Sequence, residues 1–417
     1  MTNNIIFSLD IGSSKIVAIA GAIGVDKIEV QGVSSHYFTN SNDGNDFLSM
    51  NNGVICDLEA ISSRAMKSLH EAQINADCSV GGVIVNIAGN GVNNRYNSST
   101  MVLNGQTITA SLMQQLISEA RQIKHADEYE MLDYEVQEYV LDGANYAINP
   151  IHLTANKISS NVNVFLGPNS QVTNLKKVVR YSNFDLAKIV PSGVLSGMAV
   201  LNREEKELGC CLIDIGAGTT DVVVYENGFI RYLNSIPLGG ESITRDIAQV
   251  LKISRNLAED IKLNYGGCSY VTTGATQHKF GEGINLTDHR GVNTTVSRKL
   301  LIDVIVERVR EILQAVKTSL DNEKIYDIIS SGIVLTGGTS MLPNLEDFAR
   351  HYFDVPVRLG LPDYSGDFAD LVVTPRYATS LGALYFAREY MLDEISVGKK
   401  AGFSLPGLGR KIMNLFK

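Results

Sequence analysis

Two short turns in the sequence have the composition of a phosphate-binding site. Each follows an apolar strand that ends in Asp-Ile, in the segments IIFSLDIGSSK and CCLIDIGAGTT. Glycines lack a Cβ, so backbone N–H groups can approach phosphate oxygens closely, and hydroxyl groups and a lysine add donors and positive charge. The first turn supplies Asp10, Gly12, Ser13, Ser14 and Lys15, and the second supplies Asp214, Gly216, Gly218, Thr219 and Thr220.

The two aspartates predict a magnesium site. Asp10 and Asp214 end their strands at the turns, and Mg²⁺ is commonly held by one or two carboxylates together with phosphate oxygens and several retained waters. We therefore expect both carboxylates to hold Mg²⁺ through water molecules. A single Asp-Ile-Gly turn is usually only a strand followed by a turn, so the prediction depends on the presence of two copies.

A third glycine-bearing segment, LTGGTSMLPNL, follows an apolar strand late in the chain. Gly337 and Gly338 leave room for a flat base to lie against the backbone. Two phosphate turns and one base-binding turn together predict a nucleotide site.

The elements that position these turns are repeated. Residues 5–21 and 210–230 both read as β-hairpins with tight turns. The duplication predicts two similar halves. Strand-like and helix-like segments alternate in both halves, which favours α/β domains. The segment 81–166 interrupts the first half and reads as a small α+β insertion, in which Thr109 or Ser111 can cap a helix.

The last residues form a distinct tail. Gly398, Gly402 and Pro406 mark a flexible linker before a short helix. A helical wheel over 405–417 places apolar residues on one side and basic or polar residues on the other, as in helices that lie on membranes. The predicted membrane contacts are Leu405, Leu408, Arg410, Lys411, Ile412, Met413, Leu415 and Phe416. Docking of this helix on the protein itself or on a partner is the alternative.

Composition bounds the remaining possibilities. The chain has 417 residues, enough for two to four subdomains, and a net charge of −9. The acidic balance argues against nucleic acid as the main partner. Five cysteines without a Cys-x-x-Cys pair fit reduced thiols in the cytosol. The N-terminus lacks the pattern of a signal peptide, and no apolar run is long enough to span a membrane.

The three glycine-bearing segments resemble the two phosphate motifs and the adenosine motif of the superfamily that contains actin, sugar kinases and heat-shock chaperones. This resemblance implies a two-lobed α/β fold of duplicated ribonuclease-H-like domains that binds ATP and Mg²⁺ in the cleft. It places Gly337, Gly338 and Met341 against the adenosine. The stretch AEDIK is similar to the A-E-x-x-K element of bacterial actins, which implies that Glu259 and Lys262 reach the ribose and base. Without the resemblance, this pair reads as a solvated helix face.

The run ELGCCLIDIGAGTTDVVVYENGFIRYLNSIPLGGESITRDIA and the segment GIVLTGGTSMLPNLEDFA resemble the FtsA family of bacterial cell-division proteins. The resemblance covers the chain from Ile5 to Lys417. It implies subdomain 1A in 1–80 and 167–205, the family's subdomain 1C in 81–166, a second lobe (2A and 2B) in 206–375, a return helix in 376–395, a linker in 396–404 and a membrane-targeting amphipathic helix in 405–417.

Membership of that family implies a membrane tether for the division ring. ATP would favour filaments of the protein itself, and the tail would attach them to anionic lipid on the cytoplasmic face of the inner membrane at the division site. The second lobe would bind the C-terminal peptide of FtsZ through Arg298 and Arg308, for which ordinary exposed helix arginines are an equal alternative. Subdomain 1C would face later division proteins.

Catalysis is expected to be weak at most. The segment between the lobes, KIVPSGVLSGMAVL, has no acid or amide to orient an attacking water. Nucleotide then acts mainly as a conformational ligand. A PilM-like pilus-assembly protein is the first alternative, because it shares the fold and a similar insertion but not the need for an amphipathic tail. A sugar or acetate kinase of the same superfamily is the second, although no further catalytic aspartate is apparent.

Overall fold

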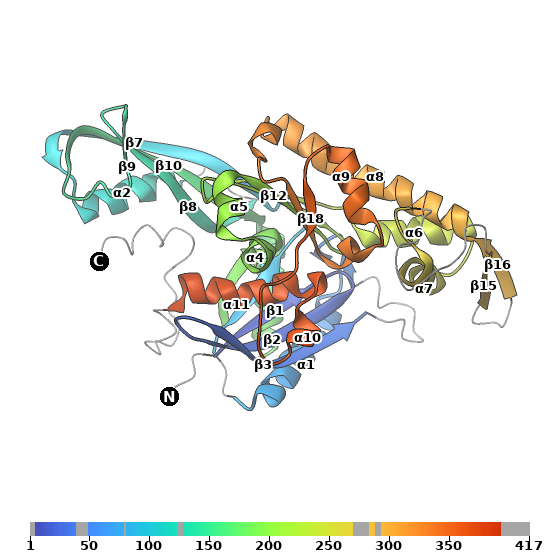
Figure 1. Cartoon of the computed structure of the whole chain (residues 1–417). Coiled ribbons are helices and arrows are strands. Elements are labelled where there is room, and N and C mark those ends of the chain that lie inside the picture. The colour runs from blue at the N-terminus through green and yellow to red at the C-terminus, as the bar shows by residue number, and fades with distance from the viewer. Residues whose placement is uncertain are drawn as a thin grey trace.

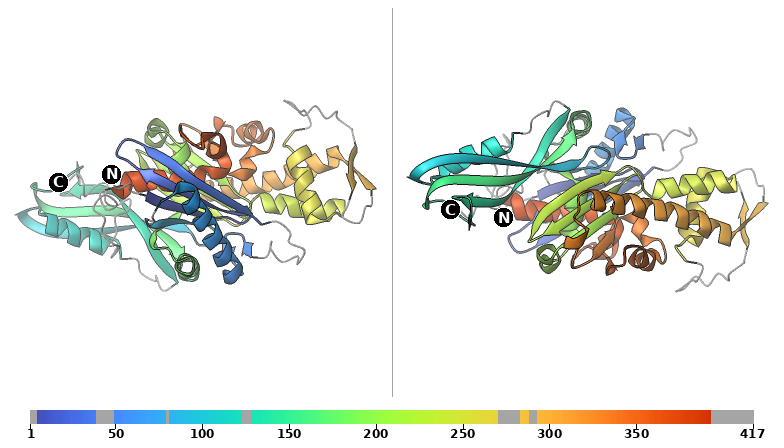
Figure 2. Two further views of the ribbon diagram at one scale, coloured as in Figure 1. Left: turned by 90° about the horizontal axis from the view of Figure 1, so that it is seen from below. Right: turned by 90° about the horizontal axis from the view of Figure 1, so that it is seen from above.

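The computed structural model describes residues 5–38, 49–78, 81–122, 128–269, 283–287 and 293–392. Two β-sheets form the centres of two lobes, and buried helices lie between them (Figure 1). The inserted segment projects at one end of the molecule, and the helices of the second lobe extend toward the other (Figure 2). The predicted linker and amphipathic helix, 396–417, lie outside the described residues.

The first lobe is built on a five-stranded sheet in the order β11-β6-β1-β2-β3. The predicted N-terminal hairpin is confirmed, since β1 and β2 pair antiparallel and Ile11 lies opposite Ile16 at the turn. Helices α1 and α3 contact one another and parts of the sheet, whereas α11 contacts β1 and β2. The elements are β1 (Ile5–Ile11), β2 (Lys15–Ile23), β3 (Ile28–Tyr37), β4 (Met50–Asn51), β5 (Val54–Ile55), α1 (Leu58–Ala76), β6 (Val83–Ile87), α3 (Asn169–Tyr181), β11 (Leu186–Pro191) and α11 (Ala378–Tyr390).

The second lobe repeats this arrangement. Strands β12 and β13 form the predicted second hairpin, with Asp214 opposite Asp221, and β17 pairs parallel to β12. Its elements are β12 (Cys210–Ile215), β13 (Thr220–Glu226), β14 (Phe229–Ile236), α6 (Gly240–Leu251), α7 (Arg255–Tyr265), β15 (Gly283–Thr287), β16 (Asn293–Ser297), α8 (Arg298–Asn322), β17 (Ile333–Thr336), α9 (Leu345–Phe353) and β18 (Val357–Leu359).

Helix α4 (Ser192–Val200) joins the lobes and is almost wholly buried. It packs against α11 so closely that a Cβ on Gly382 would lie 1.9 Å from the Leu195 carbonyl oxygen. Only glycine permits this approach, so the two helices form a tight layer between the sheets. The remaining short helices are α5 (Arg203–Leu208), η2 (Tyr326–Ile328), η3 (Gly338–Met341), α10 (Ala369–Val372) and η4 (Pro375–Tyr377).

The insertion is an α+β unit, and Thr109 caps its helix by accepting a hydrogen bond from Leu112 N, as predicted. Its elements are β7 (Asn93–Thr107), α2 (Ala110–Ala120), β8 (Tyr129–Leu141), β9 (Asn145–Ala147) and β10 (Thr154–Pro168). The expected start at residue 81 is too early, because β6 pairs with β1 and β11 in the first sheet. The sequence of β6 is a continuous apolar run, which does not indicate the sheet to which the strand belongs.

The insertion's strands continue the second lobe's sheet, which has nine strands in the order β18-β17-β12-β13-β14-β7-β10-β8-β9. Strands β14 and β7 pair at only one position, Asn234 with Asn93. Beyond that position, side-chain hydrogen bonds take the place of backbone pairing. Asn163 Nδ2 donates to the Ile230 carbonyl at 2.7 Å, and Asn94 Oδ1 accepts from Leu233 N at 2.8 Å. A seam of side-chain hydrogen bonds therefore joins the insertion to the second lobe.

Candidate functional site

The two aspartate-led turns meet across one cleft. Gly12 N donates to Lys15 O at 3.0 Å, and Gly216 N donates to Thr219 O at 2.9 Å, so both turns close in the same way. Both line a cleft of about 970 Å³ between the lobes. A Cβ on Gly218 would lie 2.1 Å from Ser13 Oγ of the other turn. The turns therefore approach each other directly, as the nucleotide prediction requires.

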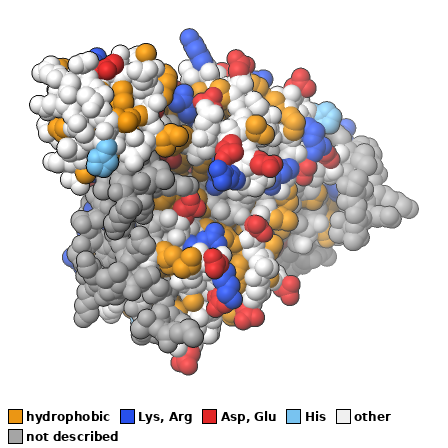
Figure 3. Space-filling view, turned by 60° about the vertical axis from the view of Figure 1, so that its left-hand side comes forward, with side chains coloured by type: hydrophobic (Ala, Val, Ile, Leu, Met, Phe, Trp, Pro, Cys, Tyr) orange, Lys and Arg blue, Asp and Glu red, His pale blue; other side chains and the backbone are white. Residues whose placement is uncertain are grey.

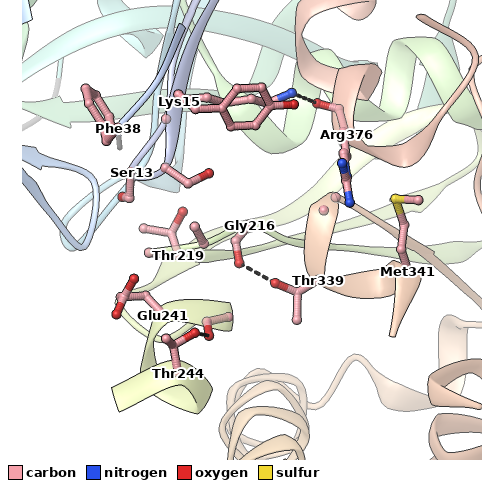
Figure 4. Close-up of a pocket in the computed structure, with 18 of the residues that line it drawn as sticks. Ser13, Lys15, Phe38, Gly216, Thr219, Glu241, Thr244, Thr339, Met341 and Arg376 are labelled. Atoms are coloured by element: carbon pink, nitrogen blue, oxygen red, sulfur yellow. Dashed lines mark hydrogen bonds between the residues drawn. The ribbon is translucent and has the colours of Figure 1, made fainter. Parts of the chain in front are cut away.

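The third glycine segment closes one side of this cleft. Gly337 has φ +85° and ψ 164°, a conformation that essentially only glycine adopts, and a Cβ there would lie 2.2 Å from Asp214 Oδ1. Thr339 Oγ1 donates to the Gly216 carbonyl at 2.9 Å, which ties this segment to the second turn (Figure 4). Gly338 and Met341 also line the cleft.

Helices α6 and α7 supply a buried polar cluster. Lys262 is 7% exposed, and its Nζ lies 2.6 Å from Glu259 Oε2 and 2.8 Å from Thr244 Oγ1. The reading of this pair as a solvated helix face is therefore wrong for Lys262, whereas the Glu259 side chain is 38% exposed. Nearby, Arg255 and Glu241 form a second ion pair of 2.6 Å at the cleft.

Burial shifts the pKa values of three charged side chains in the two predicted phosphate-binding turns. Burial, with a smaller contribution from the Asp10 charge, raises the pKa of Asp214 to about 6, and burial also raises the pKa of Asp10. Burial lowers the pKa of Lys15 to about 8, and its ammonium donates to the Arg376 carbonyl at 2.9 Å. Ionised carboxylates here are costly without a cation, so the pocket favours a bound metal or a proton.

The two carboxyl groups fit a water-mediated Mg²⁺ site. Asp214 Oδ2 accepts from Ser196 and, at 3.3 Å, from Thr379, while Asp10 Oδ2 accepts from Ser380 at 3.0 Å. Each carboxyl is thus held by one oxygen. Among the described residues, no three His, Cys, Asp or Glu side chains cluster as direct metal ligands. Mg²⁺ would need phosphate oxygens and waters as ligands besides these two groups, and this is its usual coordination in proteins.

The raised pKa of Asp214 makes a prediction about stability and pH. A carboxyl whose folded-state pKa lies above its unfolded value of 3.8 binds more protons when folded, so the free energy of unfolding falls as pH rises toward 6. Between pH 5 and 7, the titration of Asp214 should lower the free energy of unfolding of the nucleotide-free protein by about 1 kcal/mol. Urea denaturation at both pH values measures the free energy of unfolding, and Asp214→Asn should make this free energy depend less on pH. An equal pH dependence in that variant would contradict the assignment.

Most predicted nucleotide residues line the cleft, and one does not. The lining includes Asp10, Gly12, Ser13, Ser14, Lys15, Asp214, Gly216, Gly218, Thr219, Glu259, Lys262, Gly337, Gly338 and Met341. Thr220 is buried, and its hydroxyl donates to the Leu238 carbonyl at 2.8 Å, away from the cleft. Of the two threonines, Thr219, in the turn before β13, lines the cleft, whereas Thr220 begins the strand and is engaged elsewhere.

Sequence reasoning missed several polar residues of the cleft. Asn86 is the penultimate residue of β6 and lies next to the first turn, where its Oδ1 accepts from Ile11 N at 2.7 Å and its Nδ2 donates to Ser192 Oγ at 3.0 Å. Asp221 lies opposite Asp214, and burial raises its pKa well above the usual range. A polar residue that interrupts an apolar strand near its end is a signal that could have found Asn86. Nothing local in the sequence marks Thr379 or Arg376.

The two arginines expected to bind a peptide differ in accessibility. Arg298 is 5% exposed, so its reading as an ordinary exposed helix arginine is wrong. Arg308 is partly exposed and pairs with Asp246 and Glu311, each at 2.6 Å. All predicted membrane contacts, 405–417, lie outside the described residues. Where the chain is described, no helix has both the length and the apolar composition needed to cross a membrane.

Two family models match the chain. "Cell division protein FtsA" matches residues 211–382, and "SHS2 domain inserted in FTSA" matches residues 89–166. The second range agrees with the position of the insertion after β6.

Curated relatives match over most of their length. "Cell division protein FtsA" of Neisseria meningitidis serogroup B is 32% identical over 91% of this chain and 89% of the relative. The protein of the same name from Pseudomonas aeruginosa is 29% identical over 95% of this chain and 92% of the relative.

Solved structures show the same actin-like fold. A chain of a PilM-PilN type IV pilus biogenesis complex has a TM-score of 0.61 at 14% identity, covering 92% of this chain and 98% of its own. MreB5 of Spiroplasma citri bound to ADP has a TM-score of 0.56 at 16% identity, covering 94% and 99%. At these identities the likeness concerns the fold alone.

Proposed function

Because the chain belongs to the FtsA family of cell-division proteins, we propose that it is an ATP-binding, actin-like protein that polymerises and tethers FtsZ filaments to the cytoplasmic membrane. The observation that carries the nucleotide part is the direct meeting of the two aspartate-led turns in one cleft. Later division proteins would then be recruited to the same place.

The cleft is proposed to hold ATP with Mg²⁺. The backbone N–H groups around Gly12 and Gly216 would bind phosphate, Asp10 and Asp214 would hold the metal through waters, and Lys15 would leave the Arg376 carbonyl for a phosphate oxygen. The base would lie near Gly338, with Glu259 and Lys262 toward the ribose. A bound cation would offset the cost of ionising the two buried carboxyl groups.

Hydrolysis is expected to be slow, and ATP is proposed to act mainly as a conformational ligand. The connecting helix α4 offers Ser192 to the cleft, and the nearby amide of Asn86 is already engaged at both ends. Orienting a water for attack needs a free acceptor or amide at the γ-phosphate. A turnover number in the range of about 1–100 per second, typical of kinases, would contradict this expectation.

The proposed location is the cytoplasmic face of the inner membrane at the division site, with the tail as a peripheral anchor on anionic lipid. One amphipathic helix gives reversible binding, and several helices in one filament bind firmly through avidity. Self-association and membrane binding would therefore strengthen each other.

The second lobe is proposed to receive the C-terminal peptide of FtsZ along α8. Arg308 is the accessible member of the pair carried over from the family, and an acidic peptide would compete with Asp246 and Glu311 for its guanidinium. Arg298 is buried and would have to emerge before it could contact a peptide.

The insertion is proposed as the surface for later division proteins. Val102, Tyr146 and Ile148 are 70%, 75% and 84% exposed there. The space-filling view shows apolar side chains on this part of the molecule with few charges among them (Figure 3). Exposed apolar side chains of this kind suit a protein partner rather than nucleic acid.

The tail prediction has a matched pair of variants. Phe416→Glu should lower the vesicle-bound fraction by about 10-fold or more in co-sedimentation with anionic vesicles, because it places a charge on the apolar side of the proposed helix. Asn414→Glu adds the same charge to the polar side and should bind much closer to the parent. Equal losses in the two variants would mean that charge alone, not an apolar face, drives binding.

Removing the tail separates the proposed function from its main alternative. A protein ending at Ser396 should lose vesicle binding, whereas a PilM-like protein would not depend on this segment. The alternative rests on the structural likeness to a PilM chain, which concerns the fold alone. Phosphate transfer from ATP to a sugar or a carboxylate, tested over a panel of both, would instead favour the small-molecule kinase.

A further inference from the structure

Among the residues that the structure describes, four cationic side chains line the cleft, and three of them already have partners. Lys262 pairs with Glu259 at 2.6 Å, and Arg255 pairs with Glu241 at 2.6 Å. The Lys15 ammonium donates to the Arg376 carbonyl and lies 4.0 Å from the centre of the Tyr377 ring. Within the described part of the chain, the Arg376 guanidinium forms no ion pair.

Arg376 reaches the cleft from the first lobe and faces the second. It lies on η4, whose next residues begin α11, and its Cγ is 3.7 Å from the position that a Cβ on Gly338 would occupy. Figure 4 shows its side chain pointing into the cleft, between Lys15 on one side and the Thr339–Met341 segment on the other. The guanidinium therefore lies where the phosphate turns and the proposed base-binding segment meet.

We propose that the Arg376 guanidinium binds the phosphate chain of the nucleotide, as a second cation beside Lys15. A guanidinium presents paired N–H donors that match phosphate oxygens, and such charge-assisted bonds are among the stronger ones in proteins. Two cations lie on one side of the cleft, and neither forms an ion pair with a carboxylate within the described residues, so the pair favours an anion between them. The Arg376 charge also opposes protonation of Lys15 and contributes, after burial, to its lowered pKa.

The inference deepens the proposed nucleotide site and rests on it. The other role open to Arg376 is to lie flat against the base near Gly338, since guanidinium groups stack on aromatic rings. The two roles differ in what the ligand must contain. A phosphate contact matters for ATP and ADP and is absent for adenosine, whereas a stacking contact matters equally for all three.

Binding of adenosine, ADP and ATP to the full-length protein, measured by isothermal titration calorimetry with Mg²⁺, separates these roles. Arg376→Ala should lower the affinity for ADP and ATP by about 10- to 100-fold and leave the affinity for adenosine within about twofold of the parent's. Arg376→Lys should recover part of the loss, because it restores the charge but not the fork of donors. Arg388→Ala removes an equal charge from α11, outside the cleft lining, and should leave all three affinities unchanged.

The other possible results of this titration also distinguish between the roles of Arg376. Equal weakening of adenosine and ATP would overturn the phosphate role in favour of base stacking, and unchanged ATP affinity in Arg376→Ala would overturn both. Failure of the parent protein to bind any of the ligands would instead remove the proposed nucleotide site itself. If Arg376→Ala does not fold, as thermal unfolding would reveal, the same comparison made with Arg376→Gln and Arg376→Lys takes its place.

Discussion

Replacing Asp214 by asparagine should weaken binding of Mg²⁺–ATP by about 100-fold or more, because it removes one of two carboxylates proposed to hold the metal. The same change should make the nucleotide-free protein more stable. Burial raises the pKa of this carboxyl from 3.8 to about 6, so ionisation at pH 7.5 costs the folded state up to about 3 kcal/mol. An amide avoids most of that cost and can still accept hydrogen bonds from Ser196 and Thr379.

Weaker nucleotide binding together with higher stability distinguishes this role from a purely structural one. Substitution of an aspartate with only a structural role would lower the stability of the protein. Calorimetric titration gives the affinity, and urea denaturation without nucleotide gives the free energy of unfolding. Asp370→Asn changes an exposed aspartate of α10 outside the cleft and should alter neither quantity by much. Lower stability together with unchanged affinity in Asp214→Asn would contradict the proposed metal role.

Replacing Gly337 by alanine should destabilise the protein by about 2–5 kcal/mol. The residue has φ +85° and ψ 164°, which costs a side chain about 1–3 kcal/mol. Its Cβ would also lie 2.2 Å from Asp214 Oδ1 and 2.6 Å from the Ile215 carbonyl oxygen, and overpacking of this kind costs about 1–3 kcal/mol more. Because the clash involves the Asp214 carboxyl, nucleotide binding should fall as well.

The neighbouring glycine provides the control. A Cβ on Gly338 would meet only Arg376 Cγ, at the ordinary contact distance of 3.7 Å. Gly338→Ala should therefore fold with nearly the parent's denaturation midpoint, and any loss in that variant should appear in nucleotide affinity alone. Similar midpoints for the two variants would contradict the account of Gly337, since the same methyl group is added one residue apart.

The paired turns could be predicted from sequence because their geometry is local. An apolar strand, an aspartate and a glycine turn specify a hairpin within about a dozen residues, and two such hairpins predict a shared cleft. Both hairpins are present, and Gly12 and Gly216 line one cleft. The helix cap at Thr109 was predictable for the same reason.

Features that depend on long-range packing were not predictable. The apolar run of β6 could have belonged to either sheet, and its place beside β1 is set by contacts across the lobe. Arg298 reads as a surface residue because helical periodicity gives the face of a helix but not what covers it. Arg376 reaches the cleft only because the chain returns from the second lobe to the first near its end.

The nine-stranded sheet has a mechanical consequence. Both chain connections of the insertion run to the first lobe, through β6 and through α3 to β11, whereas its hydrogen-bonded layer continues the second lobe. Lys188 of β11 and Asp133 of β8, 3.4 Å apart and buried, hold it to the first lobe as well. A rotation of the lobes thus has to strain one attachment or the other. The insertion projects from both attachments at one end of the molecule (Figure 2), so a given rotation about them would displace its far end more than its base.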